Sequence, residues 1–227
     1  MKIACIFSDD EDLKFLATLV SKLEAILGKD QFKVIKLIKD VKTHYDAQNL
    51  IKESESIIFL CHGGSDYILG HNEIGLLEQG SYYQKLIGEH NITILKSKKV
   101  ICVACESKTK LAKLAIEGGC YLFVGFGDIQ FEDKYHLENG EGTSLKVEDL
   151  SQQALIEVFY KSLELVLKVK GTAQNFVDYF KLIANKKCDS LVLDAKGDGE
   201  IIRVANFLWN LKNEMELYGN NDKLFDF

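Results

Sequence analysis

The sequence predicts an α/β fold with three layers (αβα): a mostly parallel sheet between two layers of helices, extended by a helical C-terminal part. Short β-branched runs alternate with amphipathic helical patterns over residues 1–127, as in parallel strands joined by helices. The runs at 56–61 (SIIFLC) and 99–104 (KVICVA) are almost wholly apolar, which indicates strands buried on both faces. From residue 151 the pattern is mainly helical.

The N-terminal half supplies most of the expected sheet. Ser8 and Glu11 have the spacing of a capping box, which would begin a helix that Gly28 ends. A short helix is expected near residues 43–53, and another helix is expected to begin near Ser107. The expected strands are 2–7, 32–38, 56–61, 99–104 and 121–126.

The remaining segments are less regular. We expect a hairpin near 67–77 and a short helix near 81–87. Residues 128–150 are polar and acidic without a clear period, which is typical of a functional or mobile loop. Three helices and one short strand are expected after it, at 151–169, 172–186, 190–193 (strand) and 200–218. The domain prediction is a core over 1–130, a polar loop over 131–150 and a helical part over 151–227 that completes the same domain.

Composition restricts the class of function. The chain has 227 residues, of which 47% are hydrophobic, and a net charge of −6. No dense Lys/Arg block is present, so binding to nucleic acid or to anionic membrane lipid is not expected. No apolar stretch approaches the length of a membrane span, and the first residues lack a secretory signal pattern. We expect a cytoplasmic protein whose partners are proteins or small molecules.

Six cysteines are spread along the chain. Cys102 and Cys105 have C-x-x-C spacing, but no second pair completes a tetrahedral zinc site. A redox pair would begin a helix, whereas Cys102 falls inside an apolar run. Cys61 should point away from the face that its neighbour His62 uses. Most of the cysteines are therefore expected to be buried as small apolar side chains.

Two of the apolar strands end in residues suited to nucleophilic chemistry. His62-Gly63-Gly64 follows one, and Cys105-Glu106-Ser107 follows the other. Ligand sites in open α/β sheets form at the carboxyl ends of strands, and a thiol needs a base such as imidazole to become a nucleophile. A helix starting near Ser107 would favour the thiolate. The N–H groups of Gly63 and Cys105 are the expected oxyanion donors.

These residues resemble the caspase-like (clan CD) cysteine peptidases, above all their CHAT branch, which is related to separase. That family carries its base in a His-Gly after one strand and its nucleophile in an Ala-Cys after the next, often as Ala-Cys-Glu-Ser. Here IIFLCHGG is followed by KVICVACES, with the cysteine 43 residues after the histidine. The resemblance covers about residues 50–130. It implies a caspase-like sheet and a cysteine endopeptidase with the catalytic residues His62, Cys105 and Gly63.

The resemblance also implies a substrate and a mode of control. CHAT proteins often carry an acidic residue soon after a Val-Gly, and Asp128 follows Val124-Gly125 in this way, with Gly127 where that motif often has tryptophan. Asp128 would select Lys or Arg at P1, and the expected substrate-binding residues are Asp128, Gly64 and Glu106. The substrate would be a protein or peptide, and no metal or other cofactor is required. Family members are often held inactive until a protein partner or signal activates them, and a role in bacterial defence is expected at family level only.

Other interpretations stay open. Cys105 could be a buried cysteine at a strand end, and His62 a structural histidine. In that case the chain is a catalytically inactive caspase-like scaffold whose helices bind a protein. His71, His90, Glu106 and Ser107 could each orient the imidazole or shape the pocket, but solvated or capping roles are expected for all four. A flavodoxin-like ligand or signalling module is a third possibility. Asp9 and Asp10 follow the first strand as in receiver domains, but His62 stands where a receiver needs its phosphorylated aspartate.

Overall fold

The computed structural model describes residues 2–71, 85–131 and 145–225 and confirms the predicted fold class. The central sheet has the strand order β2-β1-β3-β7-β8-β9. The first five strands of this order run parallel, and β9 pairs antiparallel with β8. The strands are β1 (Ile3–Ser8), β2 (Phe32–Leu37), β3 (Ser56–Leu60), β7 (Lys99–Val103), β8 (Leu122–Gly125) and β9 (Glu216–Gly219).

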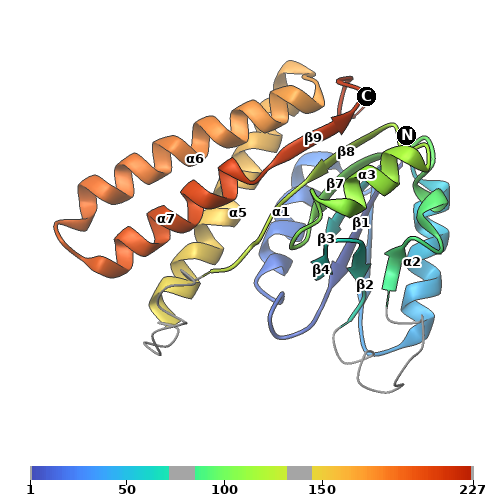
Figure 1. The fold of residues 1–227 in the computed structure, drawn as a ribbon, viewed down its shortest axis with the longest axis horizontal. Helices are drawn as coiled ribbons and strands as arrows, with labels where there is room; N and C mark the ends of the chain where they lie inside the picture. Colours follow the sequence, from blue (N-terminus) through green and yellow to red (C-terminus); the bar gives the residue numbers. More distant parts are fainter. Residues whose placement is uncertain (1, 72–84, 132–144, 226–227) are drawn as a thin grey trace.

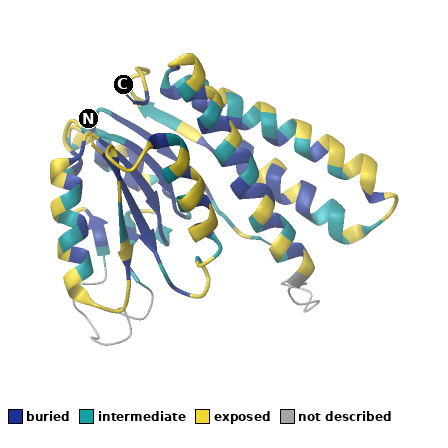
Figure 2. Ribbon diagram, turned by 180° about the vertical axis from the view of Figure 1, so that it is seen from behind, coloured by how far each residue is buried: buried dark blue, intermediate teal, exposed yellow. Residues whose placement is uncertain are grey.

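Helices cover both faces of this sheet (Figure 1). The helices α1 (Leu16–Leu27) and α5 (Leu145–Val169) pack on one face, and α2 (Val41–Glu53) and α3 (Lys110–Glu117) on the other. The short 3-10 helix η3 (Ile92–Leu95) joins the second group. Apolar side chains therefore form two cores, one on each side of the sheet, and the strands between them are largely buried (Figure 2).

The C-terminal part is an antiparallel helical arm. The helices α6 (Ala173–Ala195) and α7 (Gly199–Asn213) pack against α5 and extend beyond the sheet (Figure 1). The chain then returns to the sheet as β9. The arm shares the core of the α1 face, because Phe159 of α5 and Phe176 of α6 make an edge-to-face ring contact with centroids 5.4 Å apart. Side chains of the arm and of the sheet therefore belong to one apolar core.

A small antiparallel sheet lies beside the tip of β3. It consists of β4 (Gly63–Gly64), β5 (Tyr67–Leu69) and β6 (Lys85–Gly88). The predicted hairpin begins here, and its later part lies outside the described residues. The helix predicted near 81–87 is wrong for residues 85–87, because Leu86 and Ile87 are fully buried in a strand that pairs with β5.

Four other boundaries differ from the prediction. The capping box at Ser8 does not form, since the Ser8 hydroxyl donates to Asp10 and α1 begins only at Leu16. The helix α5 begins at Leu145, so the polar loop is shorter than 131–150. Residues 190–193 are helical within α6 rather than a strand. The closing helix ends at Asn213, and the edge strand β9 was not predicted.

Within the described ranges, none of the helices combines the length and the apolar character that crossing a bilayer demands.

Candidate functional site

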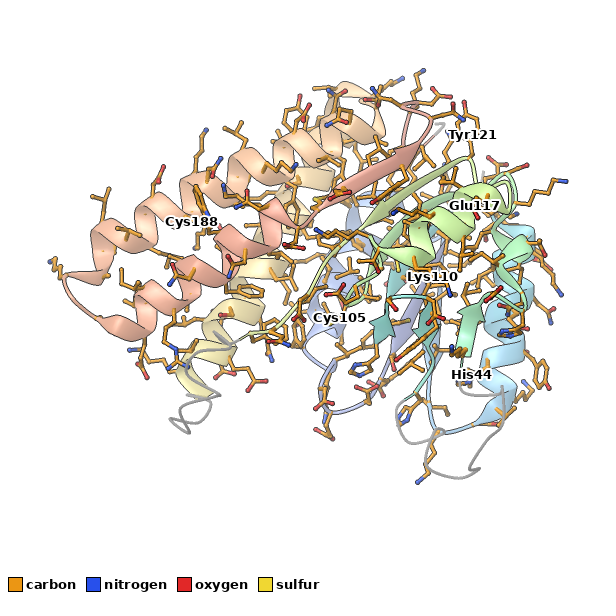
Figure 3. All side chains as sticks on the ribbon, viewed as in Figure 1. His44, Cys105, Lys110, Glu117, Tyr121 and Cys188 are labelled. Atoms are coloured by element: carbon orange, nitrogen blue, oxygen red, sulfur yellow. The ribbon has the colours of Figure 1, made fainter. Side chains whose placement is uncertain are left out.

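The tips of β3 and β7 bring His62 and Cys105 to one place. Leu60 and Val103 are register partners at the ends of these two parallel strands. The pairing continues for one more residue, because the Cys61 N–H donates to the Val103 carbonyl at 3.3 Å. The residues that follow these two strands therefore leave the sheet side by side. His62 and Cys105 both line the same cavity. In Figure 3 the labelled Cys105 lies between the helical arm and the central strands.

The cavity has a volume of about 270 Å³ and lies on the α1 and α5 side of the sheet. Its wall is built from the turn before α1, the ends of β3 and β7, the segment after β8, and α5. The lining residues are Asp12, Leu13, Phe15, Leu16, Cys61, His62, Val103, Ala104, Cys105, Ile129, Phe131, Glu148 and Leu155. Cys61 is buried, as expected, but it also forms part of the wall of this cavity.

Asp10 fixes the imidazole of His62. The two side chains meet at 2.9 Å between Asp10 Oδ1 and His62 Nε2, and Asp10 is buried. The carboxylate also accepts the Ser8 hydroxyl at 2.7 Å and the Leu13 N–H at 3.2 Å. Burial alone would raise the pKa of Asp10, but the hydrogen bonds from His62 and Ser8 outweigh it and lower the pKa to about 2. An ionised Asp10 keeps the imidazole proton on Nε2, which leaves Nδ1 as the basic nitrogen.

Sequence reasoning noticed Asp10 but missed this role. The sequence shows Asp10 only as half of a receiver-like acidic pair, because nothing in the chain order says that β1 lies next to β3. In the observed order the crossovers reverse direction between these two strands, and such reversal points are where α/β sheets form sites. The signal that could have found the pair is an acidic residue after the first strand of a sheet with this topology.

Cys105 is the most accessible of the six cysteines. It is half-buried, whereas the other five are buried. Burial raises the pKa of its thiol, and the nearby negative charges of Asp128 and Glu106 raise it further. Hydrogen bonding by the backbone of Ile129 and of Cys105 itself acts in the opposite direction. The resting thiol is therefore protonated at neutral pH and needs a base to react.

The chain after Cys105 is a turn and not the expected helix start. The helix α3 begins only at Lys110, so its N-terminus does not adjoin the thiol as predicted. The hydroxyl of Ser107 instead donates to the Cys102 carbonyl at 2.9 Å and accepts the Phe126 N–H at 3.0 Å, fully buried. Glu106 has a φ of +58°, a left-handed conformation that is uncommon outside glycine and recurs at functional sites. The hydrogen bonds of Ser107 thus stabilise the sharp turn in which Cys105 lies.

Close backbone approach explains the glycine at position 63. A Cβ there would lie 2.8 Å from the Ala104 Cβ and 3.0 Å from the Cys105 carbonyl oxygen. Leu69 N–H donates to the His62 carbonyl at 2.9 Å, so alternation along the β4–β5 ladder turns the Gly63 N–H away from β5. Gly63 therefore sits against the turn that carries Cys105, although it is not among the residues lining the cavity.

The three expected substrate-binding residues lie around the cavity rather than in its wall. Gly64 packs under the ring of Tyr67, where a Cβ would clash with it. Glu106 and Asp128 are near enough to Cys105 to raise its pKa, but neither they nor Gly64 line the cavity. Selection of a basic P1 residue by Asp128 stays a prediction.

The glycine at position 127 also has a steric explanation. A Cβ at Gly127 would overlap the carboxylate of Glu214, and the Gly127 N–H donates to the Glu214 carbonyl at 3.0 Å. The end of α7 therefore occupies the space that a larger side chain would need. This contact disfavours a large side chain such as tryptophan at this position.

A divalent cation could be held beside the same histidine. One donor atom from each of Asp10, Asp12 and His62 lies within 4.8 Å of the others. Carboxylates and an imidazole are suitable ligands for several divalent metals. Binding would draw on the Asp10 and His62 atoms that now bond to each other, so it would compete with the hydrogen bond that orients the imidazole.

The comparisons with known proteins add no relative. No known protein family has a profile that matches the chain, and no curated protein is significantly similar to it. The resemblance to caspase-like peptidases therefore stays a prediction from the motifs.

Proposed function

We propose that this chain is a caspase-like cysteine endopeptidase in which Cys105 attacks the peptide bond and His62 carries its proton. One observation supports this most strongly. The half-buried cysteine and a histidine held by a buried carboxylate line the same cavity, at the carboxyl ends of neighbouring parallel strands. A nucleophile, its base and a group that orients the base are the parts that covalent acyl transfer needs.

The first half of the proposed reaction forms an acyl-enzyme. His62 Nδ1 takes the thiol proton while the Cys105 sulfur forms a bond to the scissile carbonyl carbon. The N–H groups of Gly63 and Cys105 hold the resulting oxyanion. The C–N bond then breaks, and His62 gives its proton to the leaving amine. Throughout, the Asp10 carboxylate stabilises the imidazolium and keeps its orientation.

The second half releases the product. A water molecule gives a proton to His62 and attacks the thioester carbonyl, which passes through the same oxyanion site. Collapse breaks the C–S bond, and the sulfur recovers the proton from His62. The chain itself supplies every proton transfer in this cycle, so the proposed reaction uses no metal or other cofactor.

The raised pKa of Cys105 supports dependence on an activating event. A thiol whose pKa is raised by burial and by Asp128 and Glu106 is a weak nucleophile until the proton moves to His62. A protein partner that moves either carboxylate away from the sulfur would lower that pKa. We therefore propose that a partner or signal, as the family resemblance implies, raises the reaction rate of Cys105 above a measurable basal rate of the chain alone.

Covalent labelling tests the proposal. A peptidyl acyloxymethyl ketone pool with mixed P1 residues should alkylate Cys105, as located by mass spectrometry of the intact and digested protein. We expect His62→Ala to slow labelling by at least ~100-fold, the size of a lost general base. Cys188→Ala is the matched control, because Cys188 lies on the distant arm (Figure 3), and its labelling should equal that of the wild type. Equal labelling of wild type and His62→Ala would refute the dyad.

A second candidate function, a catalytically inactive scaffold, has its own support. Apolar side chains are exposed on the arm, with Leu193 of α6 at 78% and Trp209 of α7 at 54% exposure. Exposed apolar groups of this size occur at protein interfaces. The same labelling experiment separates the candidates, because a scaffold has no reason to need His62 for reaction at Cys105.

A further inference from the structure

We propose that the cavity beside Cys105 binds a large apolar side chain of the substrate, the one carried by the residue whose carbonyl is attacked. This inference rests on the proposed function and names the substrate class of that site. It differs from the expectation that Asp128 selects a basic P1 residue.

The wall of the cavity is mostly apolar. Its side chains come from the turn before α1, from the segment after β8 and from α5: Leu13, Phe15, Leu16, Ile129, Phe131 and Leu155. The volume of about 270 Å³ is near the lower end of the range for small-molecule pockets, ~300 Å³. A space of this size and chemistry suits one bulky apolar group with part of the adjoining chain.

The aromatic part of the wall is held in place. The rings of Phe15 and Phe131 pack edge to face with centroids 5.3 Å apart, and Phe131 contacts Phe207 of α7 at the same separation. Such contacts fix ring orientation beyond simple burial. The cavity therefore depends on three separate segments packing together, and its apolar surface is built into the fold.

The charges of the lining disfavour acidic and basic side chains. The lining contains two carboxylates besides the His62 site and no lysine or arginine. An acidic substrate side chain would thus meet like charge without a cation. Asp12 is exposed, and Glu148 is half-buried and accepts the Gln152 amide at 3.0 Å. Neither gives a basic side chain a buried counter-charge, which a cation taken out of water requires.

The position of Cys105 decides which substrate residue enters. The sulfur attacks a carbonyl, and the side chain on the carbon next to that carbonyl is the nearest one on the acyl side. Because Cys105 itself is part of the wall, together with Val103 and Ala104 before it, this side chain reaches the cavity first. The cavity therefore binds the P1 side chain and determines the preference for it.

A panel of inhibitors that differ only at P1 tests this inference. Each peptidyl acyloxymethyl ketone carries Leu, Phe, Lys, Arg or Asp at P1. The Cys105 sulfur displaces the carboxylate leaving group, which departs with the bonding electron pair, and the thiol proton goes to His62. We expect second-order labelling rates for Leu and Phe to exceed those for Lys, Arg and Asp by at least ~10-fold, the discrimination typical of an apolar pocket.

A charge placed in the wall sharpens the test. Leu13→Glu should lower the labelling rate for the Leu and Phe inhibitors by ~10-fold or more. It should also reduce the difference in labelling rate between these inhibitors and the Lys inhibitor. Leu114→Glu is the matched control, since Leu114 is also partly buried but packs on the opposite face of the sheet; it should keep the wild-type preference. Phe131→Ala, which enlarges the cavity, is a second variant, and thermal melting confirms that each protein is folded.

The possible outcomes are distinct. Fastest labelling by Leu or Phe, lost in Leu13→Glu only, supports the inference. Fastest labelling by Lys or Arg overturns it in favour of Asp128 and leaves the peptidase proposal standing, and equal rates or a preference for Asp also overturn it. Absence of Cys105 labelling by every inhibitor overturns the proposed function itself, and this inference with it.

Discussion

Two histidines of this protein lie beside cavities of similar size but in opposite chemical settings. His62 follows β3 and bonds to the buried Asp10. His44 lies on α2, beside a cavity of about 240 Å³ on the other side of the sheet. It is buried, and neither ring nitrogen reaches a hydrogen-bond partner among the described residues. Burial lowers the pKa of His44, although the nearby Asp40 backbone opposes this.

The contrast shows what turns a histidine into a candidate base. A buried carboxylate fixes the tautomer and offsets the charge of a protonated ring, and His62 has this partner. His44 is buried without a carboxylate partner for its ring nitrogens among the described residues, and it is in close contact with the backbone of Gly70. The two are nevertheless connected, because the Ser8 hydroxyl lies 2.7 Å from the Asp10 carboxylate and 3.2 Å from the Gly70 carbonyl, and its single proton is shared between these two acceptors.

The largest expected effect separates the two histidines directly. His62→Ala should lower the rate of peptide hydrolysis by ~10²–10⁴-fold, because it removes the general base. His44→Ala should keep that rate within about threefold while lowering the free energy of unfolding by about 1–3 kcal/mol, as for other buried side chains. Turnover and urea unfolding of both variants measure this. Comparable loss of turnover in both would break the comparison.

The next effect concerns the carboxylate. Asp10→Asn should lower turnover by roughly 10- to 100-fold, because an amide no longer fixes the tautomer of His62. It should also lower the free energy of unfolding at pH 7 by about 2 kcal/mol, from the pKa shift of 3.8 to about 2. A lowered carboxyl pKa stabilises the fold above 3.8, and this contribution disappears as the pH falls toward 2. The stability difference should therefore shrink in acid; a difference independent of pH would argue against an ionised Asp10.

Much of the fold could be predicted because its signals are local. The apolar runs of β3 and β7 and the helical periods of α1 and α2 are visible in short windows of sequence. The edge strand β9 could not be predicted, because its four residues show no alternation of burial and pairing with β8 decides its conformation. Residues 190–193 were wrongly assigned to a strand because Leu and Val cluster there, although Val192 and Leu193 are exposed on α6 at 53% and 78%.

The candidate site was predictable only in part. His62 and Cys105 could be paired, since each follows an apolar strand and strands in sequence order are often neighbours. Asp10 could not be assigned to the site, because its contact with His62 depends on β1 lying next to β3. The cavity wall also combines Phe15, Phe131 and Leu155 from segments far apart in the sequence. Contacts of this kind follow from packing between layers, which no local pattern encodes.

A smaller effect is expected from acid acting on His44. Because burial holds its pKa below 6.5, the folded protein binds fewer protons than the unfolded chain once the pH falls through 6.5. The free energy of unfolding should therefore decrease below that pH. His44→Gln should show a shallower decrease between pH 7 and 5, measured by urea unfolding. Parallel curves for the two proteins would show that His44 titrates normally.

The smallest effect concerns metal. Since the hydrogen bond between Asp10 and His62 already orients the base, EDTA should change the labelling rate of Cys105 by less than about twofold. Added Zn²⁺ should slow it by competing for Asp10, Asp12 and His62, and Asp12→Asn should weaken this inhibition. Loss of labelling in EDTA would mean that a metal, and not Asp10, orients the imidazole of His62.

The pH dependence of Cys105 alkylation by iodoacetamide tests most directly whether His62 takes the thiol proton. In the wild type we expect alkylation to persist at pH values well below the pKa of the thiol, which is raised. In His62→Ala this alkylation at low pH should vanish. The alkylation rate of that variant should then decrease about tenfold for each unit that the pH is lowered, in proportion to the thiolate fraction. Superimposable profiles for the two proteins would contradict the account.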